Sequence, residues 1–374
     1  MHARVSNRLA VLIVASAVVV AAAAVSAGNA RTTKAPPPAP ASFKSVLGQV
    51  KGLSLPARRA KLLQLAKEEG GFTWYTTLSS TALGTVQKAW STAFPDVKLT
   101  VYRAASEDVT AKLLAEIRTG NGQADIVECN GPNMFIFQHK RNVLIPYGTS
   151  PYRTGIVPRY RFDTFTSNHA DRFVVAWNKT LVSSPPRTFA ELGTAKWKGK
   201  LAVEATDIDW FGAMYTYLTD VRKPRMTAKA ADQLFRNIAA NAQLVNGHTS
   251  AANLLAAGQI QVLVSSHAQP IEQLAARGAP VSFGPPIVAP VIERPQGLGI
   301  PYTVTHPAGA LLFYDWMLSD EGQKLQLDTG TIPTNPKFKD GAFSSNPTTV
   351  QIDLRTLVGR WGFWTQKFNS VIGH

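Results

Sequence analysis

Hydrophobic positions along the chain switch repeatedly between helical and strand spacing, and this pattern predicts a sheet covered by helices. Residues 56–70 place leucines on one helical face and run into two glycines, which predicts an amphipathic helix with a glycine stop. Strands are predicted at residues 72–78, 97–104 and 124–130, with helices between them at 81–94 and 106–120. Strands separated by helices of this length indicate a parallel α/β sheet.

A second series of strands and helices follows, bounded by two extended apolar segments. The segments are residues 172–182 and 289–300. Between them, helices are predicted from about Phe211 and at residues 228–239, and residues 306–326 then form an amphipathic helical stretch. This order indicates an α/β fold of two lobes in which the first is interrupted by the second. The predicted first lobe is residues 56–172 and 290–374, and the second lobe is residues 173–289.

The N-terminal residues 1–30 have the pattern of an export signal. Arg4 and Arg8 precede an apolar run, and small residues then allow cleavage near Ala27–Ala30. The alternative is an uncleaved membrane anchor, because a run of this length just spans a bilayer. No cysteine follows the run, so a lipid anchor is not expected there. Export to the periplasm is predicted.

Composition narrows the class of protein. A chain of 374 residues with 45% hydrophobic and 17% charged residues is globular and long enough for two domains. Its net charge of +15 is scattered without a basic repeat, so a nucleic-acid partner is not favoured. Cys129 is the only cysteine and cannot form an intramolecular disulfide. Residues 31–55 begin with a Pro/Ala-rich stretch and are predicted to be an extended tether.

Enzyme motifs are absent from the sequence. It contains no GxSxG elbow, HExxH pair, P-loop or GxGxxG turn after a strand. Cys129 and His139 are interpreted as packing residues, not as a thiol–imidazole pair. We therefore predict a protein without catalytic residues or a resident cofactor.

Polar loops follow most of the predicted strands. In parallel α/β sheets, ligands bind beyond the carboxyl ends of the strands, where helix N-termini offer free N–H groups. Each loop alone has an alternative role in capping the next helix, but together they predict a polar cleft between two lobes. The predicted ligand-binding residues are Thr77, Ser79, Ser80, Arg103, Glu128, Asn130, Asp207, Asp209, Trp210, His248, Ser266 and His267.

The loop "EATDIDWFG" at residues 204–212 is the most informative of these. Asp209 is predicted to cap the helix that begins near Trp210, or else to contact a ligand. A capping role for Asp209 gives no reason for the presence of Asp207 and Trp210 in the same loop. An exposed indole beside a carboxylate suits a cationic or amphipathic solute, so we predict that the loop holds a ligand.

Several pieces of the chain carry a family resemblance, including "GFTWYTTLSS", "AKLLAEIRTGNGQADIVE" and "HPAGALLFYDWMLSDEGQ". They resemble the extracellular solute-binding proteins of ABC importers, most closely the ferric iron-binding branch, and the resemblance covers roughly residues 56–340. It implies a two-lobed, hinged periplasmic-binding-protein fold of the Venus-flytrap type. "RFVVAWN" and "PVIERPQGLGI" would be its two hinge-crossing segments.

The ferric branch implies iron ligands that this chain lacks. Its binders hold iron through tyrosinates, a histidine and a carboxylate, because Fe(III) favours anionic oxygen. The histidine falls near Ser79, the carboxylate near Asn130, and the adjacent tyrosine pair near Ser266 and His267. Tyr75 and Tyr215 are the candidate metal ligands if the cargo is iron, although their positions do not match the pattern.

The sequence thus predicts a solute receptor that captures a small polar or charged solute for an ABC permease in the inner membrane. It is expected to be a monomer. A ferric iron-binding receptor is the alternative, with Fe3+ as cargo. A secreted enzyme on the same scaffold is the alternative from another class, and a sensor subunit for a membrane kinase would use the same lobe closure. The identity of the solute does not follow from the sequence.

Overall fold

The computed structural model describes residues 39–338 and 348–373. The predicted signal peptide at residues 1–30, with its cleavage site, lies outside the described residues, as does the beginning of the predicted tether. Within the described part of the chain, no helix combines the length and apolar character needed to cross a membrane.

Helices and strands alternate along most of the chain. The strands are β1 (Gly71–Thr76), β2 (Lys98–Arg103), β3 (Ile126–Asn130), β4 (Phe165–Asn178), β5 (Leu201–Glu204), β6 (Ala242–Val245), β7 (Val262–His267), β8 (Val281–Ser282), β9 (Val291–Gly299), β10 (Ile332–Pro333) and β11 (Thr349–Gln351). The α-helices are α1 (Ala41–Gln49), α2 (Leu55–Glu69), α3 (Ser80–Ala93), α4 (Ser106–Thr119), α5 (Gly131–His139), α6 (Ile208–Thr219), α7 (Ala228–Asn241), α8 (His248–Ala256), α9 (Ala268–Ala276), α10 (Pro307–Leu318), α11 (Asp320–Asp328), α12 (Leu354–Gly359) and α13 (Trp361–Val371).

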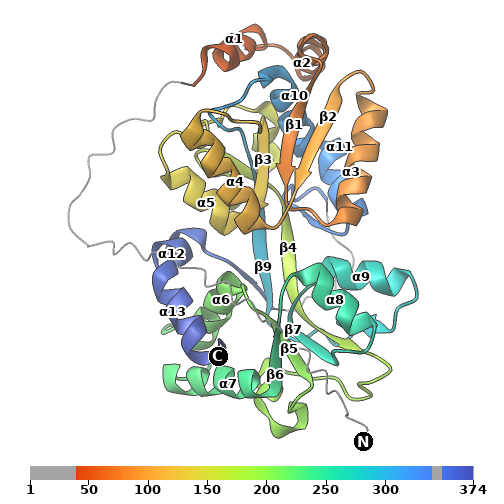
Figure 1. Ribbon diagram of the computed structural model, residues 1–374, viewed down its shortest axis with the longest axis vertical. Helices are drawn as coiled ribbons and strands as arrows, with labels where there is room; N and C mark the ends of the chain where they lie inside the picture. The colour runs from red at the N-terminus through yellow and green to blue at the C-terminus, as the bar shows by residue number, and fades with distance from the viewer. Residues whose placement is uncertain (1–38, 339–347, 374) are drawn as a thin grey trace, which may run out of the picture. The chain divides into compact units, whose positions relative to one another are not determined.

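One curled sheet connects two βα groups in the order β2-β1-β3-β9-β4-β7-β5-β6. Strands β1, β2 and β3 are parallel and form the first lobe with the helices around them, and β5 is parallel to β6 and β7 in the second lobe. The long strands β4 and β9 pair antiparallel between these groups, from Phe165 opposite Gly299 to Phe173 opposite Ile292. They are the two predicted crossing segments, and Figure 1 shows them running from one group of elements to the other. The predicted two-lobed α/β fold is confirmed, whereas the residue boundaries of the lobes remain a prediction.

Two of the predicted elements differ in the structure. The predicted helical stretch at residues 306–326 is divided into α10 and α11 at Ser319, whose Oγ accepts a hydrogen bond from the Gly322 N–H at 3.4 Å. Helix α10 is not amphipathic, because every one of its residues is buried. It packs against α2 and contacts β1, so all of its faces meet other protein.

The predicted tether at residues 31–55 also contains structure. Helix α1 lies within it, with Phe43 and Val46 buried one turn apart. The Phe43 ring packs edge-on against Tyr147 with a centroid distance of 5.8 Å. The Pro/Ala-rich composition led to the prediction of an extended tether. These two apolar residues nevertheless give the helix a surface to bury.

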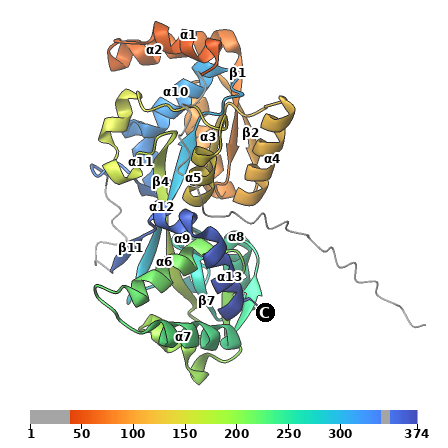
Figure 2. The ribbon, with the colours of Figure 1, turned by 90° about the vertical axis from the view of Figure 1, so that its left-hand side faces the viewer.

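The C-terminal elements β11 and α13 pack beside β9, α6 and α7, whereas the predicted boundaries assign residues 290–374 to the first lobe. Strand β11 pairs with β9, and α13 then packs against α6 and α7. The aromatic face of α13 explains this position, since Phe211 of α6 contacts the rings of Trp364 and Phe368 at 6.3 and 5.5 Å. Figure 2 shows α13 beside α6.

Candidate functional site

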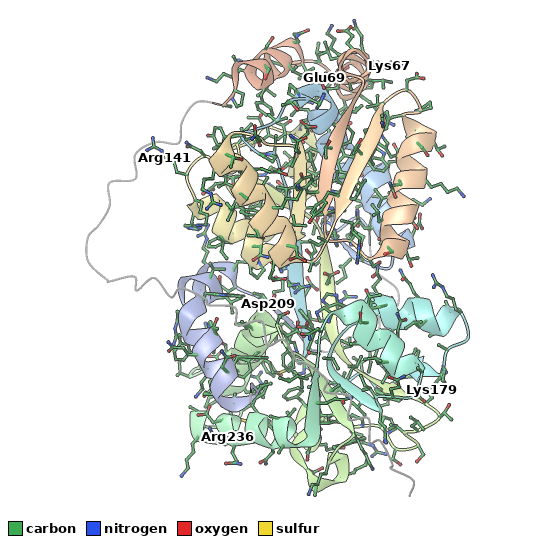
Figure 3. All side chains as sticks on the ribbon, in the orientation of Figure 1. Lys67, Glu69, Arg141, Lys179, Asp209 and Arg236 are labelled. Carbon is green, nitrogen blue, oxygen red and sulfur yellow. The ribbon has the colours of Figure 1, made fainter. Side chains whose placement is uncertain are left out.

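A polar cleft of about 560 Å³ opens between residues of both lobes. Its walls are the loops that follow β1, β2 and β3 on one side and β5, β6 and β7 on the other, and the crossing strands β4 and β9 form its floor. The volume is in the range of sites for small molecules. In Figure 3, Asp209 lies in the region between the two groups of elements, whereas Arg236 lies on α7 at the outer side of the second lobe.

Helices α3, α4, α5, α6, α8 and α9 all present their N-termini to the cleft. The first turns of α3 and α5 are capped, by Ser79 Oγ accepting from the Ala82 N–H and by Asn130 Oδ1 accepting from the Asn133 N–H. The N-cap residues of α4, α6, α8 and α9 make no side-chain cap. Backbone N–H groups at those four ends therefore remain for a solute or water, except where the protein already uses them, as at Ile208 and Trp210 of α6.

Most of the predicted ligand-binding residues line this cleft. They are Thr77, Ser79, Ser80, Arg103, Asn130, Asp207, Asp209, His248 and His267. The residues that do not line it are Glu128, Trp210 and Ser266.

Trp210 requires a correction, because its indole is not exposed. The side chain is 1% exposed and packs against the rings of Phe189 and Phe235 at 6.0 and 6.2 Å. The helix begins at Ile208, and this start turns Trp210 toward α7 instead of the cleft. Trp210 therefore offers no exposed surface to a ligand, although it lies close to two aspartates in the sequence.

Glu128 and Ser266 lie beneath the cleft. Glu128 accepts hydrogen bonds from Thr76 Oγ1 and Asn168 Nδ2, both at 2.8 Å, and lies 3.4 Å from His169 Nδ1. Burial raises the pKa of this carboxyl group, against the effect of His169 and these hydrogen bonds. Ser266 is buried and donates to the carbonyl oxygen of His267. Both side chains therefore bond within the protein and not to the cleft.

The two aspartates of the 204–212 loop have different roles from the predicted ones. Asp207, not Asp209, is the N-cap residue of α6, and it makes no cap hydrogen bond. Asp209 Oδ1 accepts from the Trp210 N–H at 2.9 Å, and its Oδ2 lies 3.4 Å from Arg294 Nη1. Asp209 is therefore anchored by a buried ion pair.

Arg294 connects the crossing strands to the second-lobe wall. Its guanidinium lies 3.6 Å from Asp171 and donates to Nε2 of His267 at 2.9 Å. Burial alone lowers the pKa of Arg294, but the carboxylates of Asp209 and Asp171 raise it above its ordinary value. Arginine has no acceptor, so His267 Nε2 accepts and the neutral ring carries its proton on Nδ1.

Two histidines stack on this wall. The rings of His248 and His267 lie 3.7 Å apart at 17°. His248 Nε2 faces Asp207 Oδ1 at 3.1 Å, and although burial lowers the pKa of His248, the Asp207 carboxylate raises it above its ordinary value. Burial lowers the pKa of His267 well below its ordinary value, and the neighbouring His248 and Arg294 add to this effect. One ring thus favours the charged form and the other the neutral form.

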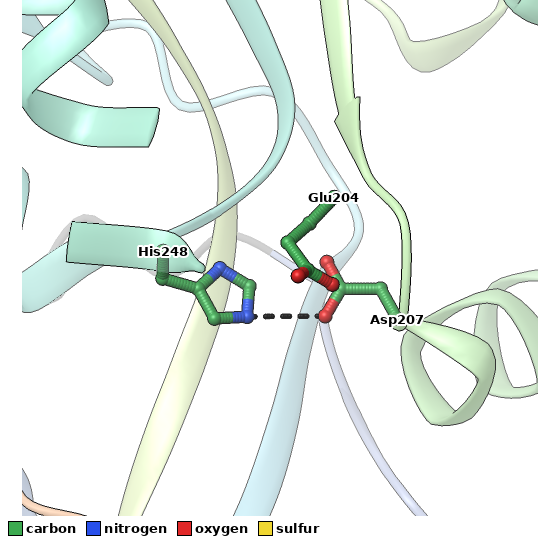
Figure 4. Close-up of side chains that lie close together, drawn as sticks. All are labelled: Glu204, Asp207 and His248. Atoms are coloured by element: carbon green, nitrogen blue, oxygen red, sulfur yellow. Dashed lines mark ion pairs between the residues drawn. The ribbon is translucent and has the colours of Figure 1, made fainter. Parts of the chain in front are cut away.

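Glu204, Asp207 and His248 form the group of potential metal-binding side chains in the described residues (Figure 4). One ligand atom from each lies within 4.8 Å of the others. Glu204 is already engaged, since its Oε2 accepts from the Thr206 N–H at 2.7 Å and its Oε1 from the Gly247 N–H at 3.0 Å. It joins the loops before α6 and α8.

The candidate iron ligands Tyr75 and Tyr215 lie outside the cleft lining. Tyr75 is 2% exposed and donates to Glu116 at 2.7 Å, and burial with this hydrogen bond raises its pKa to about 12. Tyr215 donates to Asp232 at 2.8 Å, and burial together with this carboxylate raises its pKa. A raised pKa opposes the tyrosinate form that ferric iron requires.

Several cleft residues were not predicted. Ser106 and Asn133 lie in the first turns of α4 and α5, and Asn246 lies in the loop before α8, all shortly after predicted strands, whereas Asp171, Arg294 and Gln296 lie in β4 and β9. The signal for the second group is charge in a strand that is otherwise apolar, as in "VIERPQGLG". Trp361 comes from the start of α13, and no local pattern links it to the cleft.

The fold and the cleft together define a two-lobed solute-binding protein. The family model of the bacterial extracellular solute-binding protein matches residues 78–324, well over half of the chain. The chain therefore belongs to this family. No curated protein matches it.

Solved structures with the same fold have low sequence identity to the chain. The periplasmic binding protein AfuA from Actinobacillus pleuropneumoniae, with fructose-6-phosphate bound, is 18% identical over 81% of this chain and 99% of its own, with a TM-score of 0.68. The Atu4243 GABA receptor is 18% identical over 81% of this chain and 98% of its own, with a TM-score of 0.64. Iron-bound HitA from Pseudomonas aeruginosa is 13% identical over 80% of this chain and 99% of its own, with a TM-score of 0.63.

Proposed function

We propose that the protein is the periplasmic receptor of an ABC importer and that it captures a small polar organic solute in the cleft between its lobes. The observation that carries this proposal is the chemistry of the cleft lining. Hydroxyl and amide groups with Arg103 and Glu107 stand on the first-lobe wall, and the carboxylates of Glu204, Asp207 and Asp209 stand on the second with two histidines. Such a lining matches a solute that has both hydrogen-bond donors and acceptors.

Buried polar atoms without partners support a solute in this cleft. Among the described residues, they include Asn133 Nδ2, Asp207 Oδ2, Arg294 Nε and Gln296 Oε1, and all four residues line the cleft. A buried polar atom without a partner is costly, so a ligand or ordered water in the cleft would stabilise these four groups.

Ferric iron receives less support than an organic solute. Among the residues that line the cleft none is a tyrosine, and the two candidate tyrosines bond to carboxylates elsewhere. Relatives of this fold include proteins solved with iron and with fructose-6-phosphate, so the fold itself does not choose between these cargoes.

Thermal denaturation with a panel of sugars, sugar phosphates, amino acids and ferric citrate tests this proposal. At about 100 times its dissociation constant, a ligand adds roughly 2.7 kcal/mol to the free energy of unfolding. We expect at least one organic compound to raise the melting temperature saturably, and ferric citrate to produce no visible tyrosinate-to-iron band. A stoichiometric band that is lost in Tyr75→Phe or Tyr215→Phe would restore the ferric alternative.

A further inference from the structure

The side chains around Asp207 are arranged to receive a positive charge. Asp207 is 2% exposed, its Oδ1 faces His248 Nε2, and its Oδ2 has no hydrogen-bond partner among the described residues. Glu204, 5% exposed, contributes a second carboxylate to the same group within 4.8 Å. Two buried carboxylates this close repel each other unless a cation lies between or beside them.

The cations in the described part of the chain leave Asp207 Oδ2 without a hydrogen-bond donor. Arg294 is directed to Asp209, Asp171 and His267, and no ion pair joins it to Glu204 or Asp207 in the described structure. His248 supplies one imidazolium at Asp207 Oδ1. Figure 4 shows the Asp207 carboxylate with one oxygen toward His248 and the Glu204 carboxylate beside it.

We propose that Asp207, with Glu204 behind it, is the subsite for an ammonium group of the solute, and that this group competes with protonated His248 for the Asp207 carboxylate. This inference rests on the proposed function and gives its solute a chemical class, namely a primary amine with further polar groups. An ammonium group fits because it has three donors for the oxygens of Asp207 and Glu204. Asp207 Oδ2 is buried, and an ammonium donor that reaches it leaves in place the hydrogen bonds that Glu204 makes to Thr206 and Gly247.

The competition arises from the groups around His248. From β5 and α6 it faces the carboxylates of Glu204 and Asp207, and from β7 and β9 it faces His267 and Arg294. A second positive charge at Asp207 Oδ2 partly neutralises the carboxylate that holds the proton on His248, while Arg294 continues to repel that proton. Binding of an ammonium group therefore releases a proton from His248, and affinity rises as the pH increases.

The expected pH dependence of affinity follows from the proton that His248 releases when the ammonium group binds. The pKa of His248 is raised above about 6.5, and amines keep their proton up to a pH of about 10. Affinity for an ammonium probe should increase between a pH of about 6 and about 9, by at most about tenfold per pH unit, and level off once His248 is neutral.

Isothermal titration calorimetry and thermal denaturation of the full mature protein test this inference. The probes are primary amines and amino acids, each paired with the analogue that lacks the amine, such as 4-aminobutyrate with butyrate. MgCl2 and ZnCl2 alone form a separate arm. We expect an amine to bind at least about tenfold more tightly than its analogue, and Asp207→Asn to remove this difference.

Variants of histidine separate the competition from a structural effect. His248→Gln still donates to Asp207 but does not titrate, so it should bind the amine with little pH dependence and more tightly than the natural protein at low pH. His306→Gln is the matched control, because His306 forms a similar pair with Asp125 at 2.9 Å outside the cleft. It should leave the pH dependence unchanged.

The possible results of these binding experiments distinguish a failure of the ammonium subsite from a failure of the receptor function. If amines bind no better than their analogues, the ammonium subsite is wrong, but saturable binding of any panel compound still supports the receptor function. If no compound binds, the proposed function fails as well. Saturable binding of Mg2+ or Zn2+ alone that is lost in Asp207→Asn, without amine binding, would replace the ammonium group by a metal ion and overturn the inference.

Discussion

Individual side chains of the 204–212 loop have separate structural and binding roles. Trp210 fills the second-lobe core between Phe189 and Phe235. Asp209 is fixed by Arg294, and Asp207 keeps an oxygen without a partner in the described structure. Neighbouring residues in the sequence thus belong to the core, to an ion pair and to the cleft.

Replacement of Trp210 by alanine tests its assignment to the core. Removal of a buried indole leaves a cavity, so Trp210→Ala should lower the free energy of unfolding by about 3–5 kcal/mol, while the protein that stays folded binds solute with unchanged affinity. Urea denaturation and calorimetry measure the two effects. Trp361→Ala is the comparison, since this half-buried side chain lines the cleft and should affect binding more than stability. Lost affinity in folded Trp210→Ala would contradict the assignment.

The stacked histidines should give opposite contributions to stability against pH. Because the pKa of His267 is lowered in the folded state, the unfolded chain binds its proton first, and stability falls as the pH drops below about 6.5. The raised pKa of His248 has the opposite effect on the change of stability with pH. Its stabilisation is fully present below about 6.5 and is lost as the pH rises through the raised value.

Denaturation across a pH range of about 5 to 8 measures both contributions. His267→Gln should reduce the loss of stability toward acid, with a single group contributing at most about 1.4 kcal/mol per pH unit. His248→Gln should reduce the loss toward the alkaline side. Identical pH profiles for the natural protein and His267→Gln would show that His267 is not held neutral by its surroundings.

Among the elements around the cleft, α4, α6, α8 and α9 begin without a side-chain cap from their N-cap residues. Helix α4 follows Ala105, whose φ of −66° and ψ of 159° suit an N-cap residue although alanine has no capping oxygen. Helix α7 has a side-chain cap, because Thr227 Oγ1 accepts a hydrogen bond from the Ala230 N–H away from the cleft.

An aspartate at the N-cap of α4 should therefore stabilise the protein. Ala105→Asp should raise the free energy of unfolding without solute by about 0.5–2 kcal/mol, because its carboxylate accepts from the first turn of the helix. Thermal denaturation measures this change, and Thr227→Ala should give a loss of similar size as the reciprocal control. A destabilised Ala105→Asp would mean that the free N–H groups of α4 are already satisfied.

Elements were predicted from the sequence more successfully than side-chain roles. Alternating strands and helices in the first lobe bury continuous apolar faces, so their spacing alone located β1, β2 and β3 with the helices between them. Helix α1 and the packing of α13 against α6 were missed, because each depends on contacts with residues far away in the sequence. Loop positions at strand ends identified most of the cleft residues. The burial of Trp210 and the pairing of Arg294 depend on tertiary contacts that no local pattern contains.

For the whole molecule, we expect the cleft to close around the solute. The lobes are connected through the long strands β4 and β9, and β11 lies beside β9 before the chain enters α12. Rotation about these strands would bring the two cleft walls together without changing secondary structure. Small-angle X-ray scattering should show a smaller radius of gyration with saturating solute and an unchanged circular dichroism spectrum. An unchanged radius at saturation would contradict closure.

A crystal structure with the solute found by the thermal screen tests whether the cleft is the binding site. We predict density for one organic molecule in the cleft, within hydrogen-bonding distance of Asp207 on the second-lobe wall and of Asn133 on the first. Both walls should contact the same molecule. Density for the solute outside the cleft, or for a metal ion bound by tyrosine oxygens, would show that the cleft is not a site for an organic solute.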